Sequence, residues 1–224
     1  MASSFPFVCP LCKHKEIIEF YRERDSFKRV FCRCEECRLI FLDPRLQLPM
    51  SLEKSRYENH NNSERTAGYE NFLRTLIEPL KKYIKHKMTG LDFGCGPYPM
   101  LLELMSEDGY KSIGYDPYFF NHEAVLRGSY DYITSVEVVE HFNEPLKTFT
   151  LIDNMLRKGG ILALKTSFYD DSIDFKNWYY VKDDTHISFY SIESMKWIAK
   201  HFNYEVLEVS DSVIFMRKLR SESE

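Results

Sequence analysis

Apolar residues recur at intervals of three and four along residues 69–84, which is the spacing of one face of a helix. Seven side chains form this stripe: Tyr69, Phe72, Leu73, Leu76, Ile77, Leu80 and Ile84. Pro79 lies within the stripe, and a proline inside a helix bends it because its ring clashes with the preceding turn. The pattern therefore predicts an amphipathic helix with a kink at Pro79.

Short apolar runs and helical stretches alternate through the rest of the chain. Strands are expected at 91–93, 114–116, 130–136 and 161–166, helices at 100–106, 145–158 and 191–201, and a two-stranded hairpin at 204–216. Gly159 and Gly160 are expected to stop the second of these helices. Strands that alternate with helices are typical of an α/β fold. We predict a doubly wound, mostly parallel Rossmann-like sheet that ends in an antiparallel hairpin.

The first 45 residues follow a different pattern, with two Cys-x-x-Cys pairs around short strands at 17–21 and 27–31. Cys9, Cys12, Cys34 and Cys37 could close a tetrahedral structural zinc site. Cys32 could replace Cys34, and reduced cysteines or disulfides are the alternative to a metal. We predict a zinc ribbon at 1–45, a linker with a short helix at 46–65, and a larger domain at 66–220.

Composition narrows the class of protein. The chain has 224 residues, 44% of them hydrophobic, which is enough for a core and excludes a disordered protein. A net charge of −4 argues against a broad nucleic-acid surface. There is neither an apolar run of about 18 residues nor a secretory signal pattern, so we expect a cytoplasmic protein without a membrane span.

A glycine turn follows the strand at 91–93, and Gly94 and Gly96 would let backbone approach a ligand closely. Asp116 ends the next strand, where a carboxylate can accept from two ribose hydroxyls. A dinucleotide fingerprint would need glycine or alanine at position 99, which is Pro99. Asp92 suits an ammonium group better than a pyrophosphate. These residues favour S-adenosylmethionine over NAD as the cofactor.

Only fourteen residues separate Asp116 from Asp131, which leaves room for one helix and little more. A full doubly wound sheet would place another strand here, so we expect that strand to be missing or vestigial. The adenine ring would then rest against the segment that begins with Pro117 and Tyr118.

Glu137, Glu140 and His141 follow the strand at 130–136 with the spacing of one helical turn, so their side chains could converge. One interpretation is a site for a divalent ion such as Mg²⁺, or a general-base patch. In the other, Glu137 contacts the cofactor pocket and its neighbours brace the loop.

A long connection rich in aromatic and acidic residues occupies 167–186. Long connections at strand ends are often functional, so we interpret it as a lid or substrate wall rather than as a packing loop. His186 ends this segment. Together with His141 it is a candidate for taking a proton from an acceptor, because imidazole exchanges protons near neutral pH.

The chain resembles the class I S-adenosylmethionine-dependent methyltransferases. The likeness rests on Leu91-Asp92-Phe93-Gly94-Cys95-Gly96-Pro97, on Asp116, and on Glu140-His141 followed by Pro145, Leu146 and the segment 156–161. It is similar to bacterial methyltransferases with an N-terminal zinc ribbon through the paired cysteines, the segment 39–44, Tyr57 and His60, and the segment 185–190. Glu137, Glu140 and His141 also match a metal-binding motif of ubiquinone-biosynthesis O-methyltransferases. Tyr98 departs from the pattern, since relatives usually carry a third glycine there.

The resemblance implies methyl transfer to a small-molecule acceptor, and we expect oxygen as the target atom. An RNA or tRNA methyltransferase that uses the ribbon to bind nucleic acid is one alternative, and the acidic net charge argues against it. A non-catalytic protein that docks a partner through the ribbon is another. An NAD-dependent oxidoreductase is disfavoured by Pro99.

Overall fold

The computed structural model describes residues 5–24, 29–47 and 66–220. The short helix expected after Ser51, and the Tyr57 and His60 pair, lie outside these residues. Within the described part of the chain, no helix is long and apolar enough to cross a membrane.

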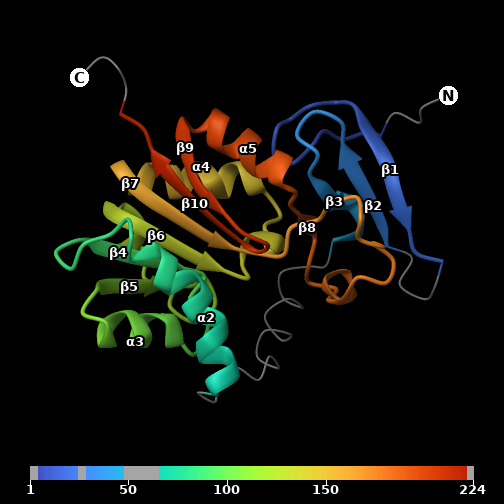
Figure 1. Cartoon of the computed structure of the whole chain (residues 1–224). Helices are drawn as coiled ribbons and strands as arrows, with labels where there is room; N and C mark the ends of the chain where they lie inside the picture. Colours follow the sequence, from blue (N-terminus) through green and yellow to red (C-terminus); the bar gives the residue numbers. More distant parts are fainter. Residues whose placement is uncertain (1–4, 25–28, 48–65, 221–224) are drawn as a thin grey trace.

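A six-stranded sheet forms the larger part of the molecule (Figure 1). Its strands, in spatial order, are β5 (Lys111–Tyr115), β4 (Thr89–Phe93), β6 (Tyr130–Val136), β7 (Leu156–Lys165), β10 (Val213–Lys218) and β9 (Tyr204–Val209). The first four are parallel, whereas β10 runs antiparallel to both β7 and β9. The predicted mostly parallel sheet with a C-terminal antiparallel hairpin is confirmed.

Helices pack on both faces of this sheet, as the alternation of side chains along its strands requires. The helices are α2 (Ala67–Leu80), α3 (Met100–Glu107), α4 (Pro145–Met155) and α5 (Ile192–His201). On β7, Ile161 and Ala163 join the apolar cluster of α2 and α3, while Leu162 and Leu164 join that of α4 and α5. The doubly wound arrangement is therefore confirmed.

The strand expected to be missing between residues 116 and 131 is absent from this fully described segment. The connection contains only a short 3₁₀ helix, Val125–Arg127, and β5 is left at the edge of the sheet. No further strand of the described chain pairs with β5 on its outer side. The loop after β5 lies next to the end of β4. The bridge between Asp116 and Phe120 closes this connection into a tight loop.

Two predicted helix ends are wrong. Helix α2 ends at Leu80, one residue after Pro79, so the proline lies in the last turn and Ile84 lies beyond the helix. Helix α4 ends at Met155 rather than at residue 158, because Leu156 already pairs with Tyr130 in the sheet. Gly159 and Gly160 lie inside β7, where the register shifts between Tyr130 and Tyr132, and they do not stop the helix.

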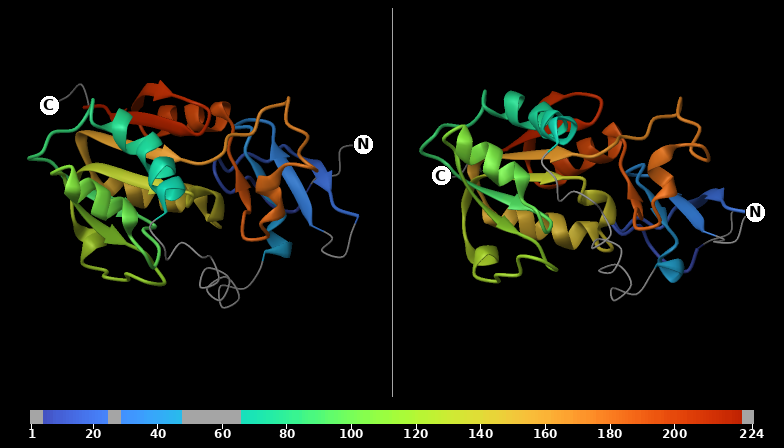
Figure 2. Two further views of the ribbon diagram at one scale, coloured as in Figure 1. Left: turned by 60° about the horizontal axis from the view of Figure 1, so that its bottom comes forward. Right: turned by 90° about the horizontal axis from the view of Figure 1, so that it is seen from below.

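The N-terminal segment builds a second sheet in the order β1 (Ile17–Arg22), β2 (Val30–Cys34), β3 (Ile40–Leu42) and β8 (Ser188–Phe189). A 3₁₀ turn, Pro44–Leu46, follows β3. In both views of Figure 2, the orange segment that leads to β8 lies against the blue strands. The expected strand at 27–31 is found at 30–34. Strand β8 comes from the range assigned to the larger domain, so the two predicted domains share a sheet.

Candidate functional site

The glycine turn after β4 uses the backbone freedom of glycine at two positions. Gly94 and Gly96 have φ values of 84° and 65°, in the left-handed region that favours glycine. A Cβ on Gly94 would lie 2.5 Å from the methyl carbons of Val138, whereas at Gly96 it would meet nothing within 4 Å. Gly94 is therefore needed for close packing, and Gly96 lies beside open space.

Asp116 ties the glycine turn to the loop after β5. Its Oδ2 accepts from the backbone N–H of Gly96 at 3.1 Å. Its Oδ1 accepts from the N–H groups of Tyr118 at 2.9 Å and Phe119 at 3.1 Å. The carboxylate is buried and lines the cavity described below, so it shapes both loops while facing that cavity.

Asp92 lies beneath the turn rather than on the cavity wall. It is 4% exposed, is not among the lining residues, and accepts from Thr134 Oγ1 at 2.8 Å. Burial, aided by the charge of Asp116 and opposed by the hydrogen bond from Thr134, raises the pKa of Asp92 to about 7. Its expected contact with a ligand's ammonium group stays a prediction.

One large cavity of about 1230 Å³ connects the glycine turn to the long loop after β7. We call the part lined by residues 93–98 and 115–119 the glycine-loop side. The histidine side is the part lined by Glu137, Val138, residues 141–143, Tyr179, Tyr180, Asp183 and His186. Pro117 and Tyr118 line the first part, as does Tyr98, which is 51% exposed.

His141 and His186 meet on the histidine side, with ring centroids 4.8 Å apart. Nδ1 of His141 lies 3.0 Å from the carbonyl oxygen of Thr185, and Nδ1 of His186 lies 2.8 Å from that of Tyr180. A carbonyl only accepts, so both Nδ1 atoms donate, and each neutral ring carries its lone pair on Nε2. Asp183 Oδ2 is 3.8 Å from Nε2 of His186.

Glu140 lies behind the two imidazoles and is fully buried. Its Oε2 accepts from Thr166 Oγ1 at 3.1 Å, and this hydroxyl is also 2.9 Å from Tyr180 Oη. Its Oε1 has no hydrogen-bond partner among the described residues. Burial, followed by the nearby charge of Glu137, raises the pKa of Glu140 well above its usual value.

Glu137 does not sit on a helical turn with Glu140 and His141. It has a φ of 52°, and the short 3₁₀ helix begins only at Val139. Its N–H donates to the carbonyl of Lys165 at 2.8 Å, and its side chain lines the cavity. Because of the bend, Glu137 is not part of the cluster of possible metal ligands. The cluster consists of Glu140, His141 and His186, whose ligand atoms lie within 4.8 Å of one another.

Magnesium has no support in this set. Mg²⁺ prefers an octahedral shell of oxygen atoms, and two of the three groups here are imidazoles.

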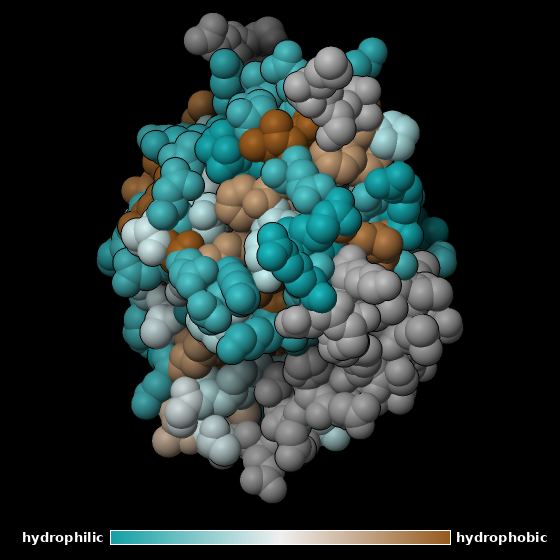
Figure 3. All heavy atoms as spheres, turned by 90° about the vertical axis from the view of Figure 1, so that its right-hand side faces the viewer, coloured by the Kyte–Doolittle hydropathy of each residue, from teal (hydrophilic) through white to brown (hydrophobic). Residues whose placement is uncertain are grey.

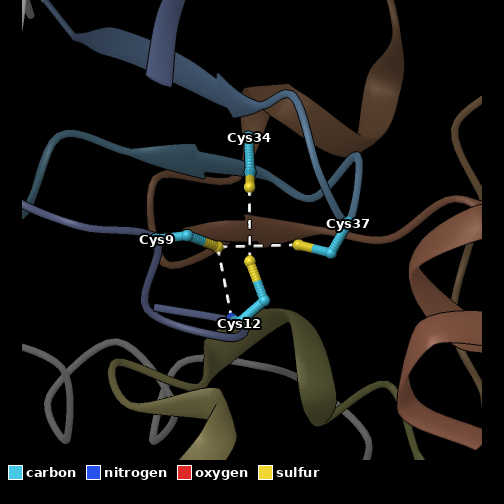
Figure 4. Close-up of side chains that lie close together, drawn as sticks. All are labelled: Cys9, Cys12, Cys34 and Cys37. Atoms are coloured by element: carbon cyan, nitrogen blue, oxygen red, sulfur yellow. Dashed lines mark hydrogen bonds between the residues drawn. The ribbon is translucent and has the colours of Figure 1, made fainter. Parts of the chain in front are cut away.

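The four predicted ribbon cysteines converge, as Figure 4 shows. The Sγ atoms of Cys9 and Cys37 are 3.6 Å apart, and those of Cys12 and Cys34 are 3.4 Å apart. Sulfurs around a tetrahedral zinc with 2.3 Å bonds lie about 3.8 Å apart, so the arrangement fits that ion. Of the two alternatives left open by the sequence, the cluster contains Cys34, while Cys32 is buried in β2 outside it.

The ribbon sheet supports the histidine side through contacts that the sequence did not reveal. Arg29 donates to the carbonyl of Val181 at 2.9 Å and contacts that of Asp183 at 3.4 Å. Phe175 packs edge-on against Phe31 with ring centroids 5.3 Å apart. The aromatic and acidic composition of residues 167–186 could have pointed to Tyr180 and Asp183, but nothing marked Arg29.

Comparisons with known proteins agree with this geometry. A family model described as a methyltransferase domain matches residues 64–209. No curated protein matches the chain in sequence. A SAM-dependent methyltransferase from Archaeoglobus fulgidus has a similar structure, with a TM-score of 0.52 and 16% identity over 75% of this chain and 99% of that one.

Two further structures are similar over most of their length. The 1,6-didemethyltoxoflavin-N1-methyltransferase of Burkholderia thailandensis, solved with its namesake compound and S-adenosylhomocysteine, has a TM-score of 0.57 and 11% identity, over 90% of this chain and 100% of that one. A putative methyltransferase in complex with the Trm112 activator of Haloferax volcanii has a TM-score of 0.54 and 13% identity, over 78% and 98%. At these identities the likeness shows the fold.

The family match covers well over half of the chain, and it includes the glycine turn, Asp116 and the loop that carries Glu140 and His141. The chain therefore belongs to the methyltransferase-domain family and is a class I S-adenosylmethionine-dependent methyltransferase.

Proposed function

We propose that the protein methylates a small-molecule acceptor, at an oxygen atom, on the histidine side of the cavity. The observation that carries this proposal is that one continuous cavity joins the glycine turn to a pair of imidazoles. Its volume of about 1230 Å³ exceeds the range of about 300–1,000 Å³ typical of single-ligand pockets. Cofactor and acceptor therefore have room to lie in line.

S-adenosylmethionine supplies a methyl group on a sulfonium and carries no phosphate. Gly94 and Gly96 keep the turn free of side chains, and Asp116, which lines the cavity, would accept from the ribose hydroxyls. Pro117 and Tyr118 would flank the adenine, and Glu137 lines the wall between the two sides. Asp92, beneath the turn, would supply negative charge toward the amino-acid end.

His186 and His141 are the groups that would accept the acceptor's proton. Both line the cavity, and both are oriented by backbone carbonyls so that Nε2 carries the lone pair. A positioned base contributes about 10²–10⁴-fold to rate. Holding the two reactants close is the other expected contribution.

The ribbon's charges do not favour the nucleic-acid alternative. Five of its arginines contact carboxylates: Arg22, Arg29, Arg33, Arg38 and Arg45. A phosphate backbone is bound by unneutralised cations, so this pairing weakens such a surface. The four ribbon cysteines would hold a structural zinc with no open coordination position.

The partner-docking alternative is not favoured by the described residues on the face in Figure 3, which are largely hydrophilic with small, separated hydrophobic areas. Among the described ribbon residues, the exposed large hydrophobic side chains are Val8 and Leu46. Docking sites usually present a larger continuous apolar patch.

Calorimetry with S-adenosylhomocysteine, paired with methyl transfer from labelled cofactor to phenolic and amine acceptors and to tRNA, tests the proposal. We expect micromolar binding and label on a hydroxyl-bearing small molecule. The His186→Ala and His141→Ala variants should keep cofactor binding and lose about 10²-fold or more in turnover. His201→Gln, at an exposed position, is the matched control. Label on tRNA or on amines alone would refute the oxygen assignment.

A further inference from the structure

Three metal-ligating side chains converge at the inner wall of the histidine side. The carboxylate of Glu140 and the imidazoles of His141 and His186 lie within 4.8 Å of one another. Glu140 and His141 are adjacent in the chain, but His186 comes from the far end of the loop after β7. A set of two histidines and one carboxylate is a recurrent binding site for transition metals that leaves coordination positions open.

The unpartnered oxygen of Glu140 points to an occupant. This residue has 0% exposure, and Oε1 has no hydrogen-bond partner in the described part of the chain. A buried carboxylate oxygen without a partner costs free energy, so such atoms in native proteins usually have an ion, a water or a proton beside them. A carboxylate oxygen can only accept, and a cation satisfies it.

Both imidazoles are already arranged as metal ligands are. Nδ1 of each ring donates to a backbone carbonyl, that of Thr185 for His141 and that of Tyr180 for His186. Such outer bonds fix the orientation and tautomer of metal-binding histidines, and place the lone pair of Nε2 toward the metal. The second oxygen of Glu140 is likewise held by Thr166.

Two further carboxyl groups lie near the three ligands. Glu137 interacts electrostatically with Glu140, and Asp183 lies 3.8 Å from Nε2 of His186. Lys165 is the cation that acts on Glu137 from β7. A divalent cation bound here would favour the ionised forms of Glu137 and Glu140, whose pKa values are raised by burial.

We propose that Glu140, His141 and His186 bind one divalent transition-metal ion, of the Zn²⁺ or Mn²⁺ class, that faces the acceptor. The inference deepens the proposed function and rests on it for the location of the acceptor. His141 and His186 line the cavity while Glu140 lies behind them, so the open positions of the ion would face the acceptor. The acceptor class is then a molecule whose hydroxyl binds the ion as an oxyanion, which favours loss of its proton. With both imidazoles acting as ligands, the hydroxyl proton would pass instead to the carboxylate of Asp183, which lines the cavity 3.8 Å from Nε2 of His186.

Titration of the full-length, ribbon-zinc-loaded protein with MnCl₂ tests the inference without relying on activity. Mn²⁺ prefers oxygen ligands to thiolates, so the cysteines of the ribbon do not compete for it. Loss of the free Mn²⁺ resonance signal, with calorimetry in parallel, should show one ion bound per chain. Glu140→Gln and His186→Ala should each weaken binding at least tenfold, and His201→Gln should not.

Absence of Mn²⁺ binding in folded protein overturns the inference, as does equal affinity in Glu140→Gln and the parent. A Glu140→Gln variant that is more stable and binds the ion unchanged would show that Glu140 is a buried neutral acid. Binding of S-adenosylhomocysteine separates the two proposals. If the cofactor product binds and Mn²⁺ does not, the metal site fails alone. If Mn²⁺ binds and the cofactor product does not, the proposed function fails.

Discussion

The two sides of the cavity are built by different means. On the glycine-loop side, Asp116 bonds to Gly96, Tyr118 and Phe119, all within twenty residues of it in the chain. On the histidine side, His141 is held by Thr185, 44 residues away, and Val181 is held by Arg29, 152 residues away. The first side is a local motif, whereas the second depends on the N-terminal ribbon. This difference predicts that the two sides can be damaged separately.

The largest effect is expected when the proposed ribbon zinc can no longer bind. In the Cys34→Ser, Cys37→Ser double variant, loss of the zinc should unfold the ribbon sheet, since structural zinc in small domains contributes about 10 kcal/mol of apparent binding free energy. The histidine side should then lose its support, with turnover falling at least 100-fold. Binding of S-adenosylhomocysteine, measured by calorimetry, should change by less than about threefold. An equal loss of turnover and of S-adenosylhomocysteine binding would contradict the separation of the two sides.

Asp92 gives the glycine-loop side a pH dependence of its own. Its pKa of about 7 in the folded protein lies above the usual value, so the folded state binds this proton more tightly than the unfolded state does. The resulting loss of folding stability is absent below about pH 4, grows as pH rises to about 7, and then stays constant. Between pH 5 and pH 8 we expect a loss of about 3 kcal/mol in the free energy of unfolding.

Urea unfolding at these pH values checks this expectation. Asp92→Asn keeps an acceptor for Thr134 and removes the titration, so its stability should fall less than that of the parent over the same range. Identical pH profiles for the two proteins would show that Asp92 keeps its usual pKa.

Asp116→Asn sharpens the comparison from the cofactor side. The variant keeps the size of the side chain but removes the charge that strengthens its hydrogen bonds with backbone and the proposed bonds with ribose, worth about 1.5–3 kcal/mol. We expect S-adenosylhomocysteine to bind about 10- to 100-fold more weakly. Binding of Mn²⁺ on the histidine side should be unchanged, and a parallel loss there would show that the two sides are coupled.

Of these variants, Arg29→Ala should have the smallest effect, and the effect should fall on the histidine side. It removes the bonds to the carbonyls of Val181 and Asp183, which loosens the loop that carries His186. We expect kcat to fall up to about tenfold with cofactor affinity unchanged. Arg22→Ala, which breaks an exposed ion pair with Glu19, is the control and should match the parent. A change in cofactor affinity in Arg29→Ala would count against the assignment of its role.

What could be predicted from the sequence follows the same division. The glycine turn and Asp116 carry local signals, because backbone freedom and a strand end are readable within about 25 residues. The cysteine spacing likewise predicted which thiols converge. The bend at Glu137 and the pairing of β8 with β3 carry no such signal. They depend on packing between distant segments, so Glu140 was grouped with Glu137 and not with His186.

The pairing of Ile40 with Phe189 also bears on how the chain folds as it is synthesised. Strand β3 leaves the ribosome early, yet its neighbour β8 follows only after all of the parallel strands. Throughout that interval the edge of the ribbon sheet lacks its native neighbour, and an open strand edge invites pairing with other chains. Closing such a distant contact is slow, since the entropy of a long loop must be overcome first. We therefore expect completion of the N-terminal sheet to be among the last events of folding, although most of its residues are among the first to be made.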